Sequence, residues 1–121
     1  MIVDERLVTY INSLDTGNTE ILDQIEKEAI AAYVPIIRKE MQSFLKLLLA
    51  MQKPMRILEV GTAVGFSAIL MAQYAPADCK IVTIENYEKR IPVAKENFKR
   101  AGKDEQITLL EGDAMQILPT L

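Results

Sequence analysis

The 121-residue chain has no histidine, the side chain that proteins use most often as a general base and as a metal ligand. It has a single cysteine, Cys79, so no disulfide can form within the chain, and we expect a reducing, cytoplasmic location. No apolar run reaches the roughly 18 residues that a membrane-spanning helix needs. The first residues, MIVDERLV, lack the basic and then apolar layout of a signal peptide, so neither membrane insertion nor secretion is expected.

A strong positive charge is also missing, because the formal net charge is −3. General nucleic-acid-binding proteins are usually basic, so the charge argues against that class, although a local basic patch stays open. Half of the residues are hydrophobic, as in an ordinary globular protein. The length suits one small domain and is too short for two ordinary ones.

Helical spacing dominates residues 1–53, which we predict to be an N-terminal helical segment. The first helix is predicted over residues 3–14, with Val3, Leu7, Val8, Ile11 and Leu14 on its apolar face. DTGN (15–18) is typical of a turn and ends this helix. Asn18 or Thr19 can cap a second helix, whose apolar face is predicted to carry Ile21, Ile25, Ala29 and Ile30.

A third helix is predicted over residues 37–51, after Pro35, and Lys53-Pro54 ends it. Its apolar stripe consists of Met41, Phe44, Leu45, Leu48 and Leu49. We expect this stripe to belong to the protein core rather than to a partner surface.

The pattern changes in residues 54–121, where short apolar runs alternate with helical segments. The runs RILEVG (56–61), KIVTIE (80–85) and QITLLEG (106–112) predict strands, the first of them buried. Helices are predicted over 65–74 and 87–101, the second with Pro92 in its first turns and Gly102 at its end. Strands that alternate with helices pair in parallel, so the sequence predicts an α/β fold with a βαβαβ half-sheet.

Two glycines flank the turn after the first strand, where a βαβ unit faces its ligand crevice. Gly61 permits a sharp turn, and Gly65 permits close approach of the next helix, whose N-terminus offers free N–H groups. GTAVG (61–65) is GxxxG rather than the dinucleotide pattern GxGxxG, and it is also compatible with an ordinary strand-to-helix turn.

Acidic residues follow the second and third strands. Glu85 stands 20 residues after Gly65, where a carboxylate can accept both ribose hydroxyls of a nucleoside. The third strand ends in EGDA (111–114), where a carboxylate can reach an adenine amino group. Each acid is equally compatible with a polar turn at a strand end.

Glu59, inside the first strand, distinguishes between nucleotide ligands. A dinucleotide would place its pyrophosphate at the glycine turn, where the carboxylate would repel it. S-adenosylmethionine (SAM) has an α-ammonium and a sulfonium and no phosphate, so it would suit this acid. A carboxylate near a buried strand end is costly unless paired, and the alternatives to a ligand are solvent or Arg56.

The stretches ILEVGTAVGFSAI, IVTIE and LLEGDA resemble the first three motifs of class I SAM-dependent methyltransferases. VPIIRKEMQSFLKLLLAMQKPMRILEVGTAVGFSA (34–68) resembles the catechol and caffeoyl-CoA O-methyltransferase group. Within that group, the chain is most similar to the bacterial branch that includes tRNA 5-hydroxyuridine methyltransferases. The resemblance covers nearly the whole chain and implies a Rossmann-like fold, truncated here, with residues 54–121 as the first half of the SAM-binding domain.

The resemblance assigns the methionine end of SAM to three residues and gives a fourth, Ile37, a contact with the cofactor. Ile37 would contact the cofactor through its backbone, and Glu59 and Gly61 would hold the amino acid. Ser67 would donate a hydrogen bond to the cofactor's carboxylate.

The adenosine end is assigned to three more residues. Glu85 would hold the ribose, and Asp113 and Ala114 would frame the adenine. Ala63 is a departure from the glycine of many methyltransferases, but alanine still permits close approach.

The resemblance also implies what this chain lacks. In the family, the acids and the amide that bind a divalent metal come from later strands, so Mg is expected only in the complete protein. No catalytic and no metal-binding residue is assigned here, and we expect the chain to be an N-terminal part that is inactive alone. The acceptor hydroxyl, of a tRNA 5-hydroxyuridine or of a small catechol-like or caffeoyl-CoA-like molecule, stays open.

In the family's strand order the first strand is central, so in this chain it becomes an edge. An apolar edge invites pairing, and we expect a homo-oligomer that covers it. The basic residues of 87–103 are interleaved with acids and indicate a solvated helix face. The alternative is that these basic residues contact tRNA. Two alternatives to the methyltransferase remain, a nucleotide-binding module of dehydrogenase type and a non-catalytic interaction domain.

Overall fold

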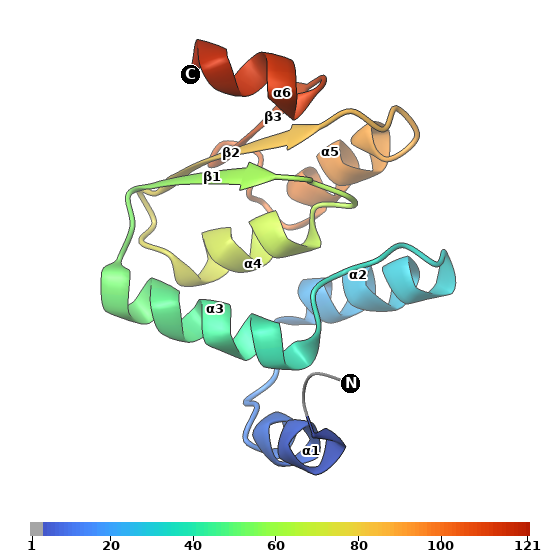
Figure 1. The fold of residues 1–121 in the computed structure, drawn as a ribbon, viewed down its shortest axis with the longest axis vertical. Helices are drawn as coiled ribbons and strands as arrows, with labels where there is room; N and C mark the ends of the chain where they lie inside the picture. The colour runs from blue at the N-terminus through green and yellow to red at the C-terminus, as the bar shows by residue number, and fades with distance from the viewer. Residues whose placement is uncertain (1–3) are drawn as a thin grey trace.

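The computed structural model describes residues 4–121, so Val3 and the start of the predicted first helix lie outside the described residues. Three helices precede an alternation of strands and helices (Figure 1). In chain order these elements are α1 (Glu5–Ser13), α2 (Glu20–Ala31), α3 (Lys39–Gln52), β1 (Arg56–Val60), α4 (Phe66–Tyr74), β2 (Lys80–Glu85), α5 (Ile91–Arg100), β3 (Ile107–Glu111), α6 (Ala114–Ile117) and the 3₁₀ turn η1 (Leu118–Thr120).

The strands form a parallel sheet in the order β1-β2-β3, which confirms the predicted α/β half-sheet. The register places Glu59 beside Thr83 and Glu85 beside Glu111. Helices α4 and α5 cover one face of this sheet, and Figure 1 shows α6 on the opposite side. The carboxyl ends of all three strands therefore meet at one edge, next to the loops that follow them.

Helix α4 forms the centre of the core, between the sheet and the helices α2 and α3 (Figure 1). Its apolar residues are buried on nearly every side, as expected for a helix with two packed faces. Cys79, immediately before β2, is completely buried in this core, and its burial raises the pKa of the thiol.

The prediction of a buried first strand is wrong for one of its faces. Leu58 and Val60 are 50% and 59% exposed, because they point to the face of the sheet away from α4 and α5. Within residues 4–121 no strand pairs with the outer side of β1. Ile57 and Glu59 point to the other face and are half-buried. The structure thus confirms that β1 is an apolar edge.

The inward face of α2 is also partly different from the prediction. Ile25 and Ala29 are buried as expected, and Ile21 packs against the core. Leu22 is buried in place of Ile30, which is 63% exposed. Thr19 caps this helix by accepting a hydrogen bond from the Leu22 N–H.

Helix α3 is rotated relative to the prediction. Leu49 is buried and Leu45 packs against the core, but Met41, Phe44 and Leu48 are exposed, so their assignment to the core is wrong. The reason is Gln42, whose buried side chain donates to the Ile37 carbonyl and to Glu26, both at 2.9 Å. These bonds fix the helix with Gln42 inward and leave an apolar face exposed.

Helix α5 begins at Ile91, four residues later than predicted, because residues 86 and 87 belong to a turn held by Glu85. Pro92 lies in its first turn and Gly102, with φ +67°, follows its end, as predicted. None of the helices within residues 4–121 combines the length and apolar character that crossing a membrane requires.

Candidate functional site

The turn between β1 and α4 folds back onto the end of β2. The N–H groups of Gly61 and Thr62 donate to the Ile84 carbonyl at 2.9 and 3.2 Å. Gly65 has a φ of +90°, and a Cβ there would lie 2.6 Å from a ring carbon of Phe98. The turn therefore lies close against both β2 and α5, as the two glycines predict.

Two hydroxyl groups hold the Glu59 carboxylate in place, and a third hydroxyl bonds to one of them. Oε1 accepts a hydrogen bond from Thr83 Oγ1 at 2.7 Å, and Oε2 accepts one from Ser67. Thr83 is in turn 2.6 Å from the Thr62 hydroxyl. Since the Thr83 proton is donated to Glu59, the Thr62 proton is donated to Thr83, and the hydrogen bonds run in one direction toward the acid.

Burial raises the pKa of Glu59 above its ordinary value, and the nearby charge of Glu85 raises this pKa further. The hydrogen bonds from Ser67 and Thr83 act in the opposite sense and favour the ionised form. A cation would therefore be stabilised more strongly beside Glu59 than beside a carboxylate in water.

Glu85 connects the glycine turn to the loop after β2. Its Oε1 accepts a hydrogen bond from the Ala63 N–H at 2.7 Å. Its Oε2 accepts hydrogen bonds from the N–H groups of Asn86 and Tyr87, both at 3.1 Å. A carboxylate offers about four acceptor positions, so these bonds leave capacity for a ligand hydroxyl. Gly112 donates to the Glu85 carbonyl at 2.9 Å, which brings the end of β3 to the same place.

A cavity of about 280 Å³ lies over the glycine turn. Its lining brings together three of the predicted site residues, Ile37, Gly61 and Ser67. The remaining lining residues are Pro35, Ile36, Thr62, Ala63 and Phe66. Glu59 adjoins this cavity through its bond with Ser67, and Glu85 adjoins it through its bond with Ala63.

Asp113 and Ala114 lie at the same edge of the sheet but do not line this cavity. Asp113 caps the short helix α6, and its Oδ1 accepts the Met115 N–H at 2.8 Å. The side chain is exposed, so its second oxygen is accessible from solvent.

The structure adds Thr62 and Thr83 to the residues found from the sequence. Both are polar and almost completely buried, with exposures of 1% and 0%. A threonine in a strand is common, so the signal would have been the parallel register, which pairs Thr83 with Glu59.

Residues 12–121 match the family model of the O-methyltransferases. The chain belongs to the O-methyltransferase family. A catechol O-methyltransferase from Mycobacterium tuberculosis is 34% identical over 114 residues, which cover 93% of this chain and 52% of that protein. The chain thus spans about half the length of this curated relative.

Solved O-methyltransferases have the same fold over about half of their own chains. The enzyme of tomaymycin synthesis from Streptomyces achromogenes, in complex with SAM, is 30% identical, with a TM-score of 0.82 over 100% of this chain and 56% of its own. The Bacillus cereus O-methyltransferase, in complex with SAH, is 26% identical, with a TM-score of 0.82; the match covers 95% of this chain and 53% of that protein. These matches confirm the predicted family and its Rossmann-like fold.

Proposed function

We propose that this chain binds SAM as part of an O-methyltransferase that transfers the methyl group to a hydroxyl oxygen. The observation that supports this most strongly is Glu59, a half-buried carboxylate oriented by two hydroxyl groups beside the glycine turn. Such an acid favours an ammonium group and disfavours a pyrophosphate. The O-methyltransferases solved with SAM and with SAH support the same ligand class.

At the methionine end, Glu59 would accept the cofactor's ammonium, directly or through water. The cavity lined by Ile37, Gly61 and Ser67 would hold the amino-acid chain. Ser67 donates to Glu59 in the structure, so donation to the cofactor's carboxylate requires its hydroxyl to turn. The Ile37 carbonyl already accepts from Gln42, which fixes the backbone that would contact the cofactor.

At the adenosine end, the Glu85 carboxylate would accept the ribose hydroxyls, since three backbone N–H groups already hold it in place. Asp113 and Ala114, after β3, would frame the adenine. Both assignments come from the resemblance, and the shared edge of the sheet supports them.

Methyl transfer requires an acceptor oxygen in line with the methyl–sulfur bond and a group that takes up the acceptor proton. Within residues 4–121 no group of three or more Asp, Glu, Cys or His side chains is placed to bind a metal, and Mg is proposed only for the complete protein. We therefore propose that this chain by itself binds the cofactor without transferring the methyl group.

Calorimetry separates this function from a dehydrogenase-type module. The chain is titrated with S-adenosylhomocysteine (SAH) and, separately, with NAD, and we expect heat of binding with SAH alone. Binding of NAD and not of SAH would overturn the proposal. Binding of neither would favour the non-catalytic interaction domain.

For the acceptor, the relative named catechol O-methyltransferase favours a small catechol-like molecule. The similarity to the bacterial branch favours 5-hydroxyuridine in tRNA, with a cytoplasmic location and a homo-oligomer as accompanying proposals. A protein extended over the full length of the family domain would be assayed with labelled SAM on catechol, on caffeoyl-CoA and on hydroxyuridine-containing tRNA. The acceptor that becomes labelled decides between them.

A further inference from the structure

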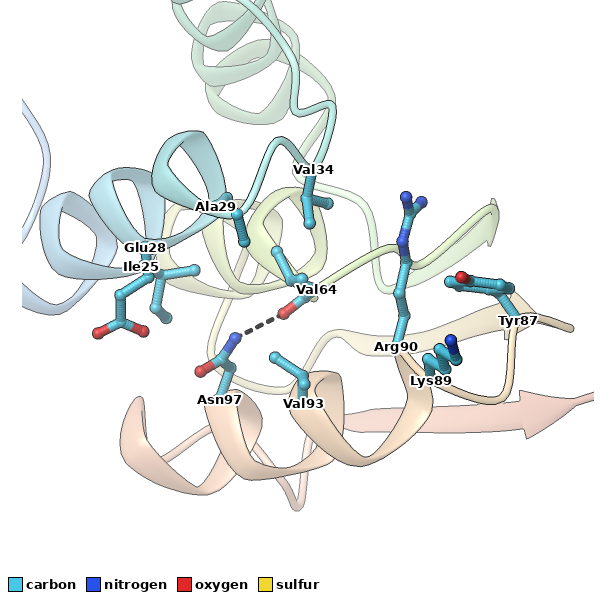
Figure 2. A pocket seen from close by; sticks show the side chains of 11 residues that line it. Ile25, Glu28, Ala29, Val34, Val64, Tyr87, Lys89, Arg90, Val93 and Asn97 are labelled. Carbon is cyan, nitrogen blue, oxygen red and sulfur yellow. Dashed lines mark hydrogen bonds between the residues drawn. The ribbon is translucent and has the colours of Figure 1, made fainter.

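A second cavity, of about 390 Å³, lies between α2 and α5 on the far side of the glycine turn (Figure 2). We call it the α2–α5 pocket. Most of its lining is apolar and comes from the two helices, from the coil after α2 and from the turn itself. These apolar residues are Ile25, Ala29, Ala32, Val34, Val64 and Val93.

One end of the α2–α5 pocket is cationic. Lys89 and Arg90 line it, and the Arg90 guanidinium lies 5.0 Å from the centre of the Tyr87 ring (Figure 2). Among residues 4–121, neither Lys89 nor Arg90 forms an ion pair. The two positive charges are therefore free to bind an external anion.

The acidic residue in the lining does not cancel this charge. Glu28 accepts two hydrogen bonds from the Arg100 guanidinium, at 2.8 and 3.0 Å, and this pairing lowers the pKa of Glu28. The buried Asn97 is also engaged, because it donates to the Val64 carbonyl at 2.8 Å (Figure 2). The polar groups away from Lys89 and Arg90 are thus already satisfied.

We propose that the α2–α5 pocket binds a small amphipathic anion, with an apolar ring or chain against the valines and a carboxylate or phosphate at Arg90. A cavity of this size, apolar with a few convergent polar groups, has the usual properties of a small-molecule site. The planar guanidinium, held against Tyr87, suits the two oxygens of such a head group.

This site lies directly behind the candidate cofactor cavity. Val34 and Val64 line the α2–α5 pocket, whereas residues 35–37 and 61–63 line the cofactor cavity. Tyr87 connects the α2–α5 pocket with Glu85, because its N–H donates to Glu85 while its side chain lines the pocket. An anion in the pocket would contact the glycine turn from its rear side and, if the proposed function holds, would change the affinity for SAH.

The probe is anilinonaphthalene sulfonate, whose fluorescence rises on binding, compared with a neutral phenylnaphthylamine. We expect Arg90→Gln to weaken binding of the sulfonate about tenfold, as the loss of a charge-assisted hydrogen bond predicts, and to leave the neutral dye unchanged. Val93→Trp, which fills the pocket from an exposed position, should abolish sulfonate binding. Lys99→Gln, on the same helix but outside the lining, should change nothing.

Equal sulfonate affinity in the wild type, Arg90→Gln and Val93→Trp would overturn the proposal, because the dye would then bind another apolar surface such as the exposed face of α3. Displacement of the dye by naphthoate or by naphthyl phosphate distinguishes the carboxylate from the phosphate. Thermal unfolding confirms that each variant is folded. A failure to bind SAH would refute the proposed function and leave this dye result standing.

Discussion

The Thr83 hydroxyl donates a hydrogen bond to Glu59 Oε1 at 2.7 Å, across the register pair that joins β2 to β1. Thr62 completes this arrangement from the glycine turn, at 2.6 Å from Thr83. The orientation of the acid is therefore set by buried groups beneath the site.

Thr83→Val keeps the shape of the side chain and removes its hydroxyl. It leaves the buried Thr62 hydroxyl without its Thr83 partner and Glu59 with the Ser67 hydroxyl alone, so we expect a loss of about 1–3 kcal/mol in the free energy of unfolding. SAH affinity should fall about tenfold, because the carboxylate keeps only one of its two orienting hydrogen bonds. Calorimetry and urea unfolding measure both effects. Thr83→Ser, which retains the hydroxyl, should restore the affinity, and equal weakening by both variants would contradict a role of the hydroxyl.

Glu59→Gln should stabilise the ligand-free chain at neutral pH and weaken SAH binding. Because the pKa of Glu59 is raised in the folded state, its ionisation removes stability as the pH rises from the ordinary value of 4.5 through the raised value. The variant lacks this loss, so the difference in unfolding free energy should grow over that range and then stay constant. Thermal unfolding from pH 4 to pH 8 measures it, and a difference that shrinks with rising pH would contradict the assignment.

Glu85→Ala should weaken SAH binding more than Glu111→Ala, its neighbour in the sheet register. Glu85 accepts three backbone N–H groups and would accept the ribose, so we expect a loss of about 10- to 100-fold. Glu111 is exposed and pairs with Lys95 at 2.8 Å, a surface contact of little energetic weight. Titration calorimetry compares the two variants, and similar losses in both would argue against a specific contact with the ribose.

Gly65→Ala should destabilise the fold by about 3 kcal/mol, because it combines a positive φ with a clash against Phe98. Gly102→Ala is the matched control, since its φ is also positive but a Cβ there meets nothing within 4 Å. We expect a cost of about 1 kcal/mol for that control. Chemical unfolding separates the two, and equal costs would show that the clash is relieved by movement of α5.

Leu58→Lys should reduce self-association of the chain. Leu58 is half-exposed on the β1 edge, and a lysine there opposes pairing between edges. Size-exclusion chromatography with light scattering over a range of concentrations measures the effect. Leu47→Lys, on the exposed face of α3, is the control, and dissociation by that variant alone would move the interface to α3.

The strands could be predicted almost to the residue. Residues 80–85 match β2, whereas β1 differs from its prediction by one residue at one end and β3 by one residue at each end. The agreement arises because β-branched runs are bounded by proline, glycine and polar turns. The rotation of α3 could not be predicted in the same way. Leucine occupies positions 45, 47, 48 and 49, which face several directions, and the inward face is selected by the tertiary bonds of Gln42.

The candidate site could likewise be predicted only in part from the sequence. Glu59 could be proposed from the sequence because it is a charge inside an apolar strand, and Glu85 because it follows Gly65 by 20 residues. The partners of Glu59 could not, because Ser67 and Thr83 reach it only through the α4 packing and the strand register. The assignments of Asp113 and Ala114 to the adenine remain predictions.

The chain's single thiol, at Cys79, can report how often this domain opens transiently. It is fully enclosed and resists ionisation, so a thiol-specific reagent can modify it only in molecules that have opened transiently. Labelling rates under native conditions would then rank every substitution proposed above by how often it lets the sheet open. No reporter group has to be introduced for this purpose.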